Sequence, residues 1–434
     1  MALTSRAALA AALATVVVAV LPLPVKASLA LVDGALIALI ALDALLAHRP
    51  ASIGLVREAP SHLGVGERGG VRLRLANPWP RPAHCLLYQA LPGSLRPSAR
   101  RRAVAVPALG EAEMAVEIRP RDRGRIPLGT VTVRLAGPLR LAARQRRFDL
   151  GDLLKVYPPF ASKREADLRV ERGRLLEVGL RSAPGRGGGT EFDSLRDYHL
   201  DDEFRRIDWS ATARSGKAIA RDYRAERSQP VIMLLDTGRT MAGRVAGVTR
   251  LEHALDAVLT LTTLATRLGD RAGLVAFAQD VRATVSPSAS RLQFGRVVEA
   301  VYTLDARLAE SDYANAVAAT LARFPRRALL VLLTELADEA VTSTILRSLP
   351  LALRHHLVVI ASVADPAVEA LARATPQDAR AAYRQAAALS AMADRASVAA
   401  RMQALGALVV DAPPGALAPR LADAYLDVKA RGRL

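Results

Sequence analysis

Residues 231–241 read VIMLLDTGRTM: five apolar side chains, then Asp236, and then Gly238 and Thr240 at alternate positions. A continuous apolar run that ends in a polar turn is typical of a strand buried on both faces. Such strands belong to parallel sheets that helices cover on both sides. The polar residues then lie beyond the carboxyl end of the strand, where open α/β sheets bind ligands.

The sequence on the carboxyl side of this stretch alternates between apolar strands and amphipathic helices. Strands are expected at 231–236, 271–278, 328–336, 357–363 and 407–412. Helices are expected at 250–269, 290–304, 311–324 and 366–405, and a last one runs through Tyr425. The alternation predicts an α/β domain with a doubly wound sheet over residues 228–434, with a helical insertion at about 365–405.

Two apolar stretches, 7–21 and 28–47, lie near the amino terminus. The second is long enough to cross a hydrocarbon core of about 30 Å. Its acids, Asp33 and Asp43, lie near its ends, where we expect water or headgroups to reach them. We therefore assign residues 1–48 to a membrane anchor.

We predict that the first apolar stretch is one arm of an uncleaved, multi-pass transmembrane hairpin, because Pro22 and Pro24 make a natural tight turn between two spans. The alternative is a cleavable signal peptide. In both cases the later domains are expected in the cytoplasm, and the chain in the cell membrane. Arg6, Arg49 and Arg57 flank the apolar stretches, which fits the excess of positive charge on the cytoplasmic side.

Short alternating runs occupy the segment between the anchor and the α/β domain. VRLRLAN (71–77), AVEIRP (115–120) and TVTVRLAG (130–137) alternate apolar and polar side chains between Gly and Pro. This period of two is typical of half-buried antiparallel strands. We predict a small β-sandwich-like domain over residues 49–155.

A densely charged string, 190–227, lies within the expected linker segment 156–227. Acids and arginines alternate there with aromatic residues, and two readings are open. The charges form a structural collar of paired side chains, or they form a docking surface, because exposed pairs add only about 0–1 kcal/mol of stability each. In the docking reading Arg205, Arg206 and Asp208 orient the surface and Trp209 anchors it in the core.

The strings EFDSLRDY, RRIDWSATAR and LLDTGRTM resemble the bacterial domain-of-unknown-function 58 family, whose carboxyl-terminal half is similar to von Willebrand factor A domains. The resemblance implies a von Willebrand factor A-like domain and a partnership with MoxR-type AAA+ ATPases in the assembly or activation of other proteins. It covers essentially the whole chain. One departure is Asp201-Asp202, where the family commonly has Gly-Asp after the tyrosine.

Von Willebrand A domains hold Mg²⁺, and the resemblance transfers that site to this chain in altered form. Asp236 and Thr240 match the first loop, Ser311 or its neighbour Asp312 the second, and Glu335 the third. Gly238 stands where a serine hydroxyl is expected. We therefore expect a degenerate site with weak Mg²⁺ binding that Gly238→Ser strengthens, or a turn that Asp236 merely caps.

The remaining features narrow the class of function. Five of the 60 basic residues are lysines, and the net charge of +18 comes without an aromatic-interleaved basic stretch or zinc spacing, so no nucleic-acid partner is predicted. Cys85 is the single cysteine. No GxSxG, HExxH or P-loop occurs, so we predict no enzyme.

The sequence therefore predicts a membrane-anchored, non-catalytic scaffold or adaptor that works with a separate ATPase on a client protein. The alternative is a metal-dependent module for acidic protein ligands. No other cofactor is expected.

Overall fold

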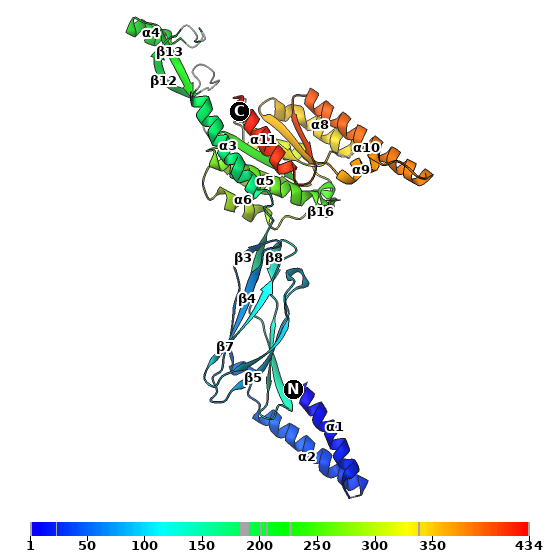
Figure 1. Cartoon of the computed structure of the whole chain (residues 1–434). Helices are drawn as coiled ribbons and strands as arrows, with labels where there is room; N and C mark the ends of the chain where they lie inside the picture. The colour runs from blue at the N-terminus through cyan, green and yellow to red at the C-terminus, as the bar shows by residue number, and fades with distance from the viewer. Residues whose placement is uncertain are drawn as a thin grey trace. The chain divides into compact units, whose positions relative to one another are not determined.

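Two units make up the computed structural model, Met1–Tyr157 and Pro158–Leu434 (Figure 1). The described residues are 2–22, 24–182, 191–199, 202, 204, 207–224, 228–336 and 339–432. Each unit has its own sheets and its own hydrophobic core. We describe each unit by itself.

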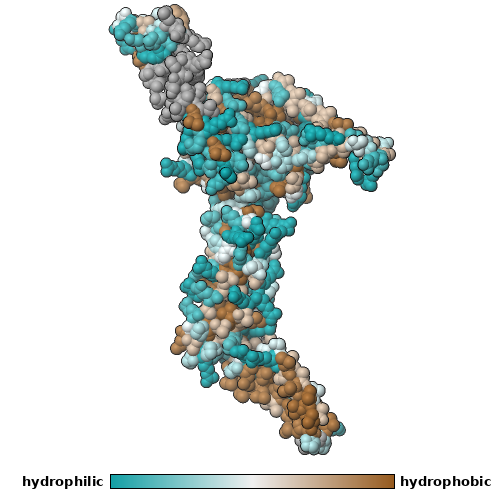
Figure 2. Space-filling view, viewed as in Figure 1, coloured by the Kyte–Doolittle hydropathy of each residue, from teal (hydrophilic) through white to brown (hydrophobic). Residues whose placement is uncertain are grey.

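The first unit begins with a short strand, β1 (Ala2–Leu3), and two apolar helices, α1 (Ser5–Val20) and α2 (Val25–Leu46). Most of their large side chains face outward, and Figure 2 shows this part of the molecule as a strongly hydrophobic surface. Helix α2, with 22 residues, is about 33 Å long and is long and apolar enough to cross a membrane. Helix α1, with 16 residues, is only about 24 Å long.

Both ends of this helical pair are fixed to the β-rich part of the unit. Strand β1 pairs with β10 (Ala142–Phe148), and the Thr4 amide donates to the Leu141 carbonyl at 3.1 Å. Asp43 of α2 accepts hydrogen bonds from the Leu139, Leu141 and Ala142 amides at 2.7, 2.7 and 2.8 Å.

The expectation that water or headgroups reach Asp43 is therefore wrong, because Asp43 is fully buried against the turn that joins β9 (Val131–Ala136) to β10. A Cβ atom at Gly137 would lie 2.4 Å from an oxygen of that carboxylate, so only glycine allows this approach. Further along, the His48 ring stacks on Trp79 at 4.2 Å between ring centroids. The end of α2 is thus joined to the β-rich part at two places.

Three sheets form the β-rich part of the first unit. They have the strand orders β1-β10-β9-β5-β6, β2-β4-β7 and β3-β11-β8. The remaining strands are β2 (Gly54–Glu58), β3 (His62–Gly64), β4 (Gly69–Ala76), β5 (Ala83–Gln89), β6 (Arg101–Val106), β7 (Glu111–Ile118), β8 (Gly124–Pro127), β9 (Val131–Ala136) and β11 (Leu153–Tyr157). Alternate side chains of the first two sheets share one core, which includes Leu73, Leu87, Met114 and Val133. The three alternating runs expected to be strands are β4, β7 and β9.

The second unit contains a six-stranded sheet of order β18-β17-β14-β19-β20-β21. All neighbours are parallel except β18, which runs antiparallel to β17 at one edge. The strands are β14 (Pro230–Asp236), β17 (Arg271–Phe277), β18 (Val281–Ser288), β19 (Leu329–Leu333), β20 (Leu357–Val363) and β21 (Leu408–Ala412). In chain order this is 3-2-1-4-5-6, a doubly wound sheet whose order reverses between β14 and β19.

Helices cover both faces of this sheet (Figure 1). Ile232 and Leu234 of β14 share a core with α7, α8 and α10, whereas Met233 faces Thr262 of α5. The helices are α3 (Lys163–Ser182), α4 (Trp209–Ser215), α5 (Arg250–Arg267), α6 (Gln293–Val301), α7 (Tyr313–Arg323), α8 (Glu339–Leu353), α9 (Pro366–Arg373), α10 (Ala379–Ala404) and α11 (Leu417–Ala430). The mixed α/β class expected from the sequence is confirmed.

Several elements were not expected. Helix α3, within the segment expected to be a charged linker, packs on α5 and α11, and Arg169 forms a two-point ion pair with Asp423 at 2.9 and 3.1 Å. The charged string contributes an antiparallel hairpin, β12 (Glu191–Asp197) and β13 (Ile219–Arg224), with α4 beside β13. Strand β18 and helix α8 were also missed.

Candidate functional site

The strongest candidate site lies where β14 ends, at the point where the strand order of the sheet reverses. Asp236 is the last residue of β14 and is fully buried. Its Oδ1 accepts from the Gly238 amide at 2.8 Å and from the Ser311 hydroxyl at 2.5 Å. Its Oδ2 accepts from the hydroxyls of Tyr313 and Thr334 at 2.6 and 2.7 Å. The carboxylate therefore has four protein donors, two on each oxygen.

Gly238 makes room for one of these donors. A Cβ atom at this position would lie 2.1 Å from Ser311 Oγ and 3.0 Å from the Ala309 carbonyl oxygen. The Ser311 hydroxyl thus fills the space that any side chain at position 238 would need. The expectation that Gly238→Ser strengthens a metal site conflicts with this geometry, because the new side chain would displace Ser311 from Asp236.

Tyr313 closes the other side of the carboxylate. Its hydroxyl lies 2.6 Å from Asp236 and 2.9 Å from Thr334 Oγ1, and its ring packs edge-on against Phe277. Burial, followed by the negative charge of Asp236, raises the pKa of Tyr313 above its ordinary value. The phenol therefore stays protonated and acts as a hydrogen-bond donor.

Glu335 lies in a second cluster, apart from Asp236. Its carboxylate forms ion pairs with Arg250 of α5 and Arg395 of α10, and its side chain is 4% exposed. Arg395 also binds both oxygens of Asp411 at 2.6 and 2.7 Å and donates to Ser362 at 2.6 Å. Burial lowers the pKa of Arg395, but hydrogen bonds and charges from Asp411 and Glu335 outweigh it and raise that pKa overall. Two arginines thus neutralise two carboxylates.

Of the expected metal ligands, the structure brings Ser311 to Asp236 but places Asp312 and Glu335 in other contacts. Ser311 contacts Asp236, but its neighbour Asp312 instead caps α7 through the Asn315 amide at 2.9 Å. Thr240 lies in a 3-10 turn, Arg239–Ala242, and makes no hydrogen bond to Asp236 among the described residues. Mg²⁺ needs near-octahedral oxygen ligands. One carboxylate already bound by four protein donors does not fit that requirement. In the part of the chain that the structure describes, no three His, Cys, Asp or Glu residues are grouped to hold a metal ion.

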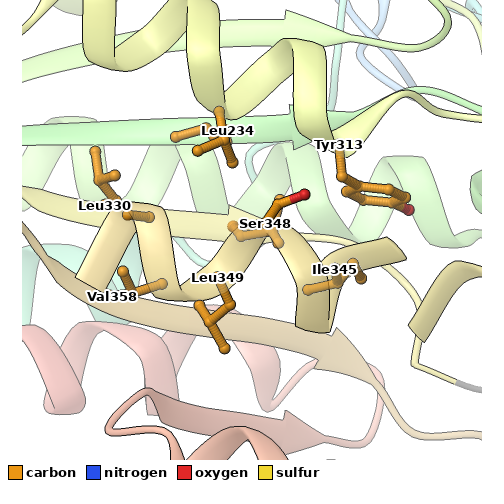
Figure 3. A pocket seen from close by; sticks show the side chains of 10 residues that line it. Leu234, Tyr313, Leu330, Ile345, Ser348, Leu349 and Val358 are labelled. Atoms are coloured by element: carbon orange, nitrogen blue, oxygen red, sulfur yellow. The ribbon is translucent and has the colours of Figure 1, made fainter. Parts of the chain in front are cut away.

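A small cavity lies beside Tyr313, between the sheet and helices α7 and α8 (Figure 3). Its volume is about 20 Å³, and its lining is apolar apart from the Tyr313 and Ser348 hydroxyl groups. This volume suits about one water molecule, whereas ligand pockets are typically about 300–1,000 Å³. An organic cofactor does not fit here.

The four residues expected to dock a partner belong to the hairpin region. Arg205 and Arg206 lie outside the described residues. Asp208 caps α4 through the Ala211 amide at 3.0 Å and pairs with Arg221 at 2.9 Å. The hydrogen bond from the Ala211 amide, and then the one from Arg221, lower the pKa of Asp208.

Trp209 does not anchor this region in a core, and that expectation is wrong. The side chain is 60% exposed and packs edge-on against Phe204, itself 69% exposed, at 5.6 Å between ring centroids. The hairpin therefore presents two neighbouring aromatic side chains to solvent.

Of the pair Asp201-Asp202, the structure describes the second residue, which matches the Asp of the family's Gly-Asp. Asp202 binds both terminal nitrogens of Arg196 at 2.6 and 2.7 Å and accepts from the His199 amide at 2.9 Å. The hydrogen bond from Arg196, followed by that from His199, lowers the pKa of Asp202 to about 2. Asp202 thus fixes the turn that follows β12, while Asp201 lies outside the described residues.

Sequence reasoning missed Tyr313, Thr334, Arg250 and Arg395. Tyr313 and Thr334 lie close in sequence to Ser311 and Glu335, which were singled out. The sequence therefore offered a signal for Tyr313 and Thr334. Arg395 lies 60 residues from Glu335 along the chain, inside an Ala-rich helix, and no local pattern marks it.

The family model described as "Protein of unknown function DUF58" matches residues 194–401. The resemblance to this family that was expected from the sequence strings is thereby confirmed over residues 194–401. A curated relative is "Uncharacterized protein YeaD" of Bacillus subtilis (strain 168), which is 26% identical over 182 residues. The match covers 41% of this chain and 45% of the relative, so the chain spans about half the length of that protein.

Three solved structures resemble parts of the chain at low TM-scores. The CARDB domain of a Pyrococcus furiosus protein in complex with di-metal ions is 11% identical and covers 24% of this chain and 92% of that chain, with a TM-score of 0.16. The C. elegans MSP family member WR4 is 11% identical and covers 23% of this chain and 94% of that chain, with a TM-score of 0.17. Salmonella alpha-2-macroglobulin reacted with methylamine is 14% identical and covers 30% of this chain and 11% of that chain, with a TM-score of 0.19. At these scores none carries an argument about this chain.

Proposed function

We propose that the protein is a membrane-anchored, non-catalytic scaffold or adaptor whose second unit is a von Willebrand factor A-like domain. The observation that carries this proposal is the saturation of Asp236 by four protein donors. The place where an open α/β sheet binds its ligand is therefore filled by the protein itself. The strand order and the antiparallel edge strand β18 support the domain class.

A scaffold acts through its surfaces, and the hairpin β12–β13 with α4 carries the best candidate surface. Phe204 and Trp209 are exposed side by side, and aromatic residues of this kind often dominate binding energy at interfaces. Charged pairs such as Arg221–Asp208 flank them, and charged residues around aromatic anchors add orientation and partner specificity. The partner class, a MoxR-type AAA+ ATPase, is taken from the family resemblance, and the lack of a P-loop in this sequence makes a separate ATPase necessary.

Binding of a purified MoxR-type ATPase to the full chain in lipid nanodiscs tests the proposal. Trp209→Ala should weaken binding by about tenfold or more, as expected for a central aromatic anchor. Tyr383→Ala is the matched control, because Tyr383 is an 80% exposed aromatic residue on α10 of the same unit. Equal affinities of both variants and the unchanged chain would overturn the docking surface. A pull-down from membranes with mass spectrometry would then identify the client protein.

The anchor is proposed to be a two-helix hairpin with both ends in the cytoplasm. Its support is the attachment of β1 to β10 and of Asp43 to the β9–β10 turn, which brings the start of α1 and the end of α2 to the same β-rich structure. A reporter enzyme that is active only in the periplasm should stay silent when fused after Leu434. A strongly active fusion would refute this orientation.

A further inference from the structure

The apolar helices leave the five-stranded sheet β1-β10-β9-β5-β6 from one end (Figure 1). At this end the register pairs Ala2 of β1 with Ala143 of β10, and the Ala143 row continues across β9 to His84 of β5. Strand β1 leads directly into α1, and Asp43 of α2 accepts from the Ala142 amide in the neighbouring position. His84 therefore lies in the row of the sheet to which both helices are joined.

Two arginines lie close to the His84 ring. Arg140, in the β9–β10 turn, donates from a terminal nitrogen to His84 Nε2 at 2.5 Å. Arg6, in the first turn of α1, is near enough for its charge to act on the same ring. Partial burial, and then the charges of Arg140 and Arg6, lower the pKa of His84, so the ring stays neutral and accepts the hydrogen bond. We name Arg6 and Arg140 the arginine pair.

The arginine pair has no acidic partner within the part of the chain that the structure describes. Asp43 is the acid built into this joint, and amides of the β9–β10 turn occupy both of its oxygens. Elsewhere in the same unit arginines are paired, since Arg57 binds Asp152 at 2.6 Å. Like charges held together without a counter-charge repel each other, which points to an external anion at the arginine pair.

The backbone at Arg140 adds an independent observation. Its φ of 57° lies in the left-handed region, which glycine adopts freely and which costs energy for arginine. The turn is held by the Thr4 hydroxyl, which donates to the Arg140 carbonyl, and by the Arg140 amide, which donates to the Gly137 carbonyl at 3.0 Å. An arginine thus stands where glycine would fit the backbone better, and strained positions of this kind cluster at ligand sites.

The depth of this joint suits a lipid headgroup. Helix α2 is about 33 Å long, so when it crosses a hydrocarbon core of about 30 Å, the residues after Leu46 reach the headgroup layer. His48 stacks there on Trp79 at 4.2 Å between ring centroids, and tryptophan is enriched at this layer. The hydrogen bonds of Asp43 hold the β9–β10 turn, which carries Arg140, beside this end of α2.

We propose that the arginine pair binds the headgroup phosphate of an anionic phospholipid in the membrane that α2 enters. Arginine forms two-point hydrogen bonds with phosphate, and basic residues next to a membrane anchor favour anionic lipid surfaces. His84 orients Arg140 without adding a positive charge of its own. The inference rests on the membrane-anchor part of the proposed function.

Arginine-selective dicarbonyl labelling of the full chain, read by peptide mass spectrometry, tests the proposal. The chain is placed in nanodiscs of phosphatidylcholine alone or with phosphatidylglycerol. Arg6 and Arg140 should react about fivefold more slowly in the anionic discs. Arg147, exposed at the opposite end of the same sheet, is the internal control and should react equally in both discs.

Arg49 separates a built site from the general attraction of an anionic surface. It is exposed three residues beyond the end of α2 and lies outside the arginine pair. Its protection in the anionic discs should be smaller than that of Arg6 and Arg140. Equal protection of all three side chains would overturn the site, because the surface potential alone would then explain the result.

Variants test whether both arginines bind one headgroup. Arg140→Gln should remove most of the protection of Arg6, whereas the matched control Arg147→Gln should leave it unchanged. Arg6→Gln is the reciprocal variant, which leaves the β9–β10 turn intact, and should remove most of the protection of Arg140. Full protection of the remaining arginine in both variants would overturn the shared site.

Further arms separate lipid from other anions and from failure of the anchor. Inorganic phosphate or a poly-glutamate peptide is added to the phosphatidylcholine discs. Protection by either that matches or exceeds the protection by phosphatidylglycerol would overturn the lipid assignment, in favour of a soluble phosphate or an acidic protein surface. Equal labelling rates in both discs, with the chain inserted in each, would overturn the lipid site and leave the anchor standing. A chain that enters neither disc would instead refute the anchor.

Discussion

At the residue scale, position 238 shows how a missing side chain can be part of a hydrogen-bond network. Gly238→Ala would place a Cβ atom 2.1 Å from Ser311 Oγ and push that hydroxyl away from Asp236. The loss of one hydrogen-bond donor to a buried carboxylate lowers the free energy of unfolding by about 1–3 kcal/mol. We expect the free energy of unfolding of the second unit to fall by that amount, measured by urea denaturation.

Ser311→Ala provides the control for this prediction. It removes the same hydrogen bond and vacates the space that a side chain at position 238 needs. The double variant should therefore cost clearly less than the sum of the two single variants. Strict additivity would show that Gly238 and Ser311 do not compete for one space.

His356 leads to a prediction about pH. It is 4% exposed, and neither ring nitrogen has a hydrogen-bond partner among the described residues. Burial, followed by the charge of His355, lowers the pKa of His356. Because the unfolded chain binds this proton more readily, stability falls as pH drops below the unfolded value of about 6.5. In His356→Leu, the melting temperature should fall less between about pH 8 and pH 5 than in the unchanged chain. In His355→Leu, a change at an exposed residue, the melting temperature should fall almost as much as in the unchanged chain.

At the element scale, the turn after β12 depends on one ionised carboxylate. The pKa of Asp202 is held at about 2 by Arg196 and His199, below the unfolded value of about 3.9. The contribution of ionised Asp202 to the stability of this turn is therefore complete above about pH 4 and is lost as pH falls toward 2. Hydrogen exchange of residues 195–224, corrected for intrinsic rates, should be slower in the unchanged chain than in Asp202→Asn at pH 6. The difference should shrink toward pH 2, and a constant difference would contradict the prediction.

The elements also show what sequence patterns can and cannot predict. Continuous apolar runs predicted β14, β17, β19, β20 and β21, because burial on both faces requires them. Strand β18 and helix α8 were missed, since Pro287 and Pro350 interrupt the patterns that mark a strand and a helix. At the site, Asp236 was marked by the apolar run that it ends and Ser311 by the family resemblance, whereas Tyr313 and Thr334 were missed. The pairing of Glu335 with Arg395 depends on how α10 packs, which no local spacing encodes.

At the scale of the whole molecule, the anchor is tied to the β-rich part through Asp43. Asp43→Ala would leave the Leu139, Leu141 and Ala142 amides without their acceptor, and each unsatisfied buried amide costs about 1–3 kcal/mol. Exchange of the amides in residues 139–142 should accelerate about tenfold or more in the nanodisc-bound chain. Asp33→Ala, at the other acid of α2, should leave these rates unchanged. Unchanged exchange in both variants would show that Asp43 does not hold this turn.

The pairing of Ala2 with Ala143 has a consequence for the order of events during synthesis. The edge of the five-stranded sheet cannot close until roughly 140 further residues have been made, which takes on the order of ten seconds at bacterial ribosome speeds. Throughout that interval the apolar helices exist without the strands that later hold them. In the proposed membrane-anchored protein, an insertion machinery or the lipid itself would receive them first. Membrane entry would then precede completion of the sheet, and a delay in entry would leave a nascent chain prone to aggregate.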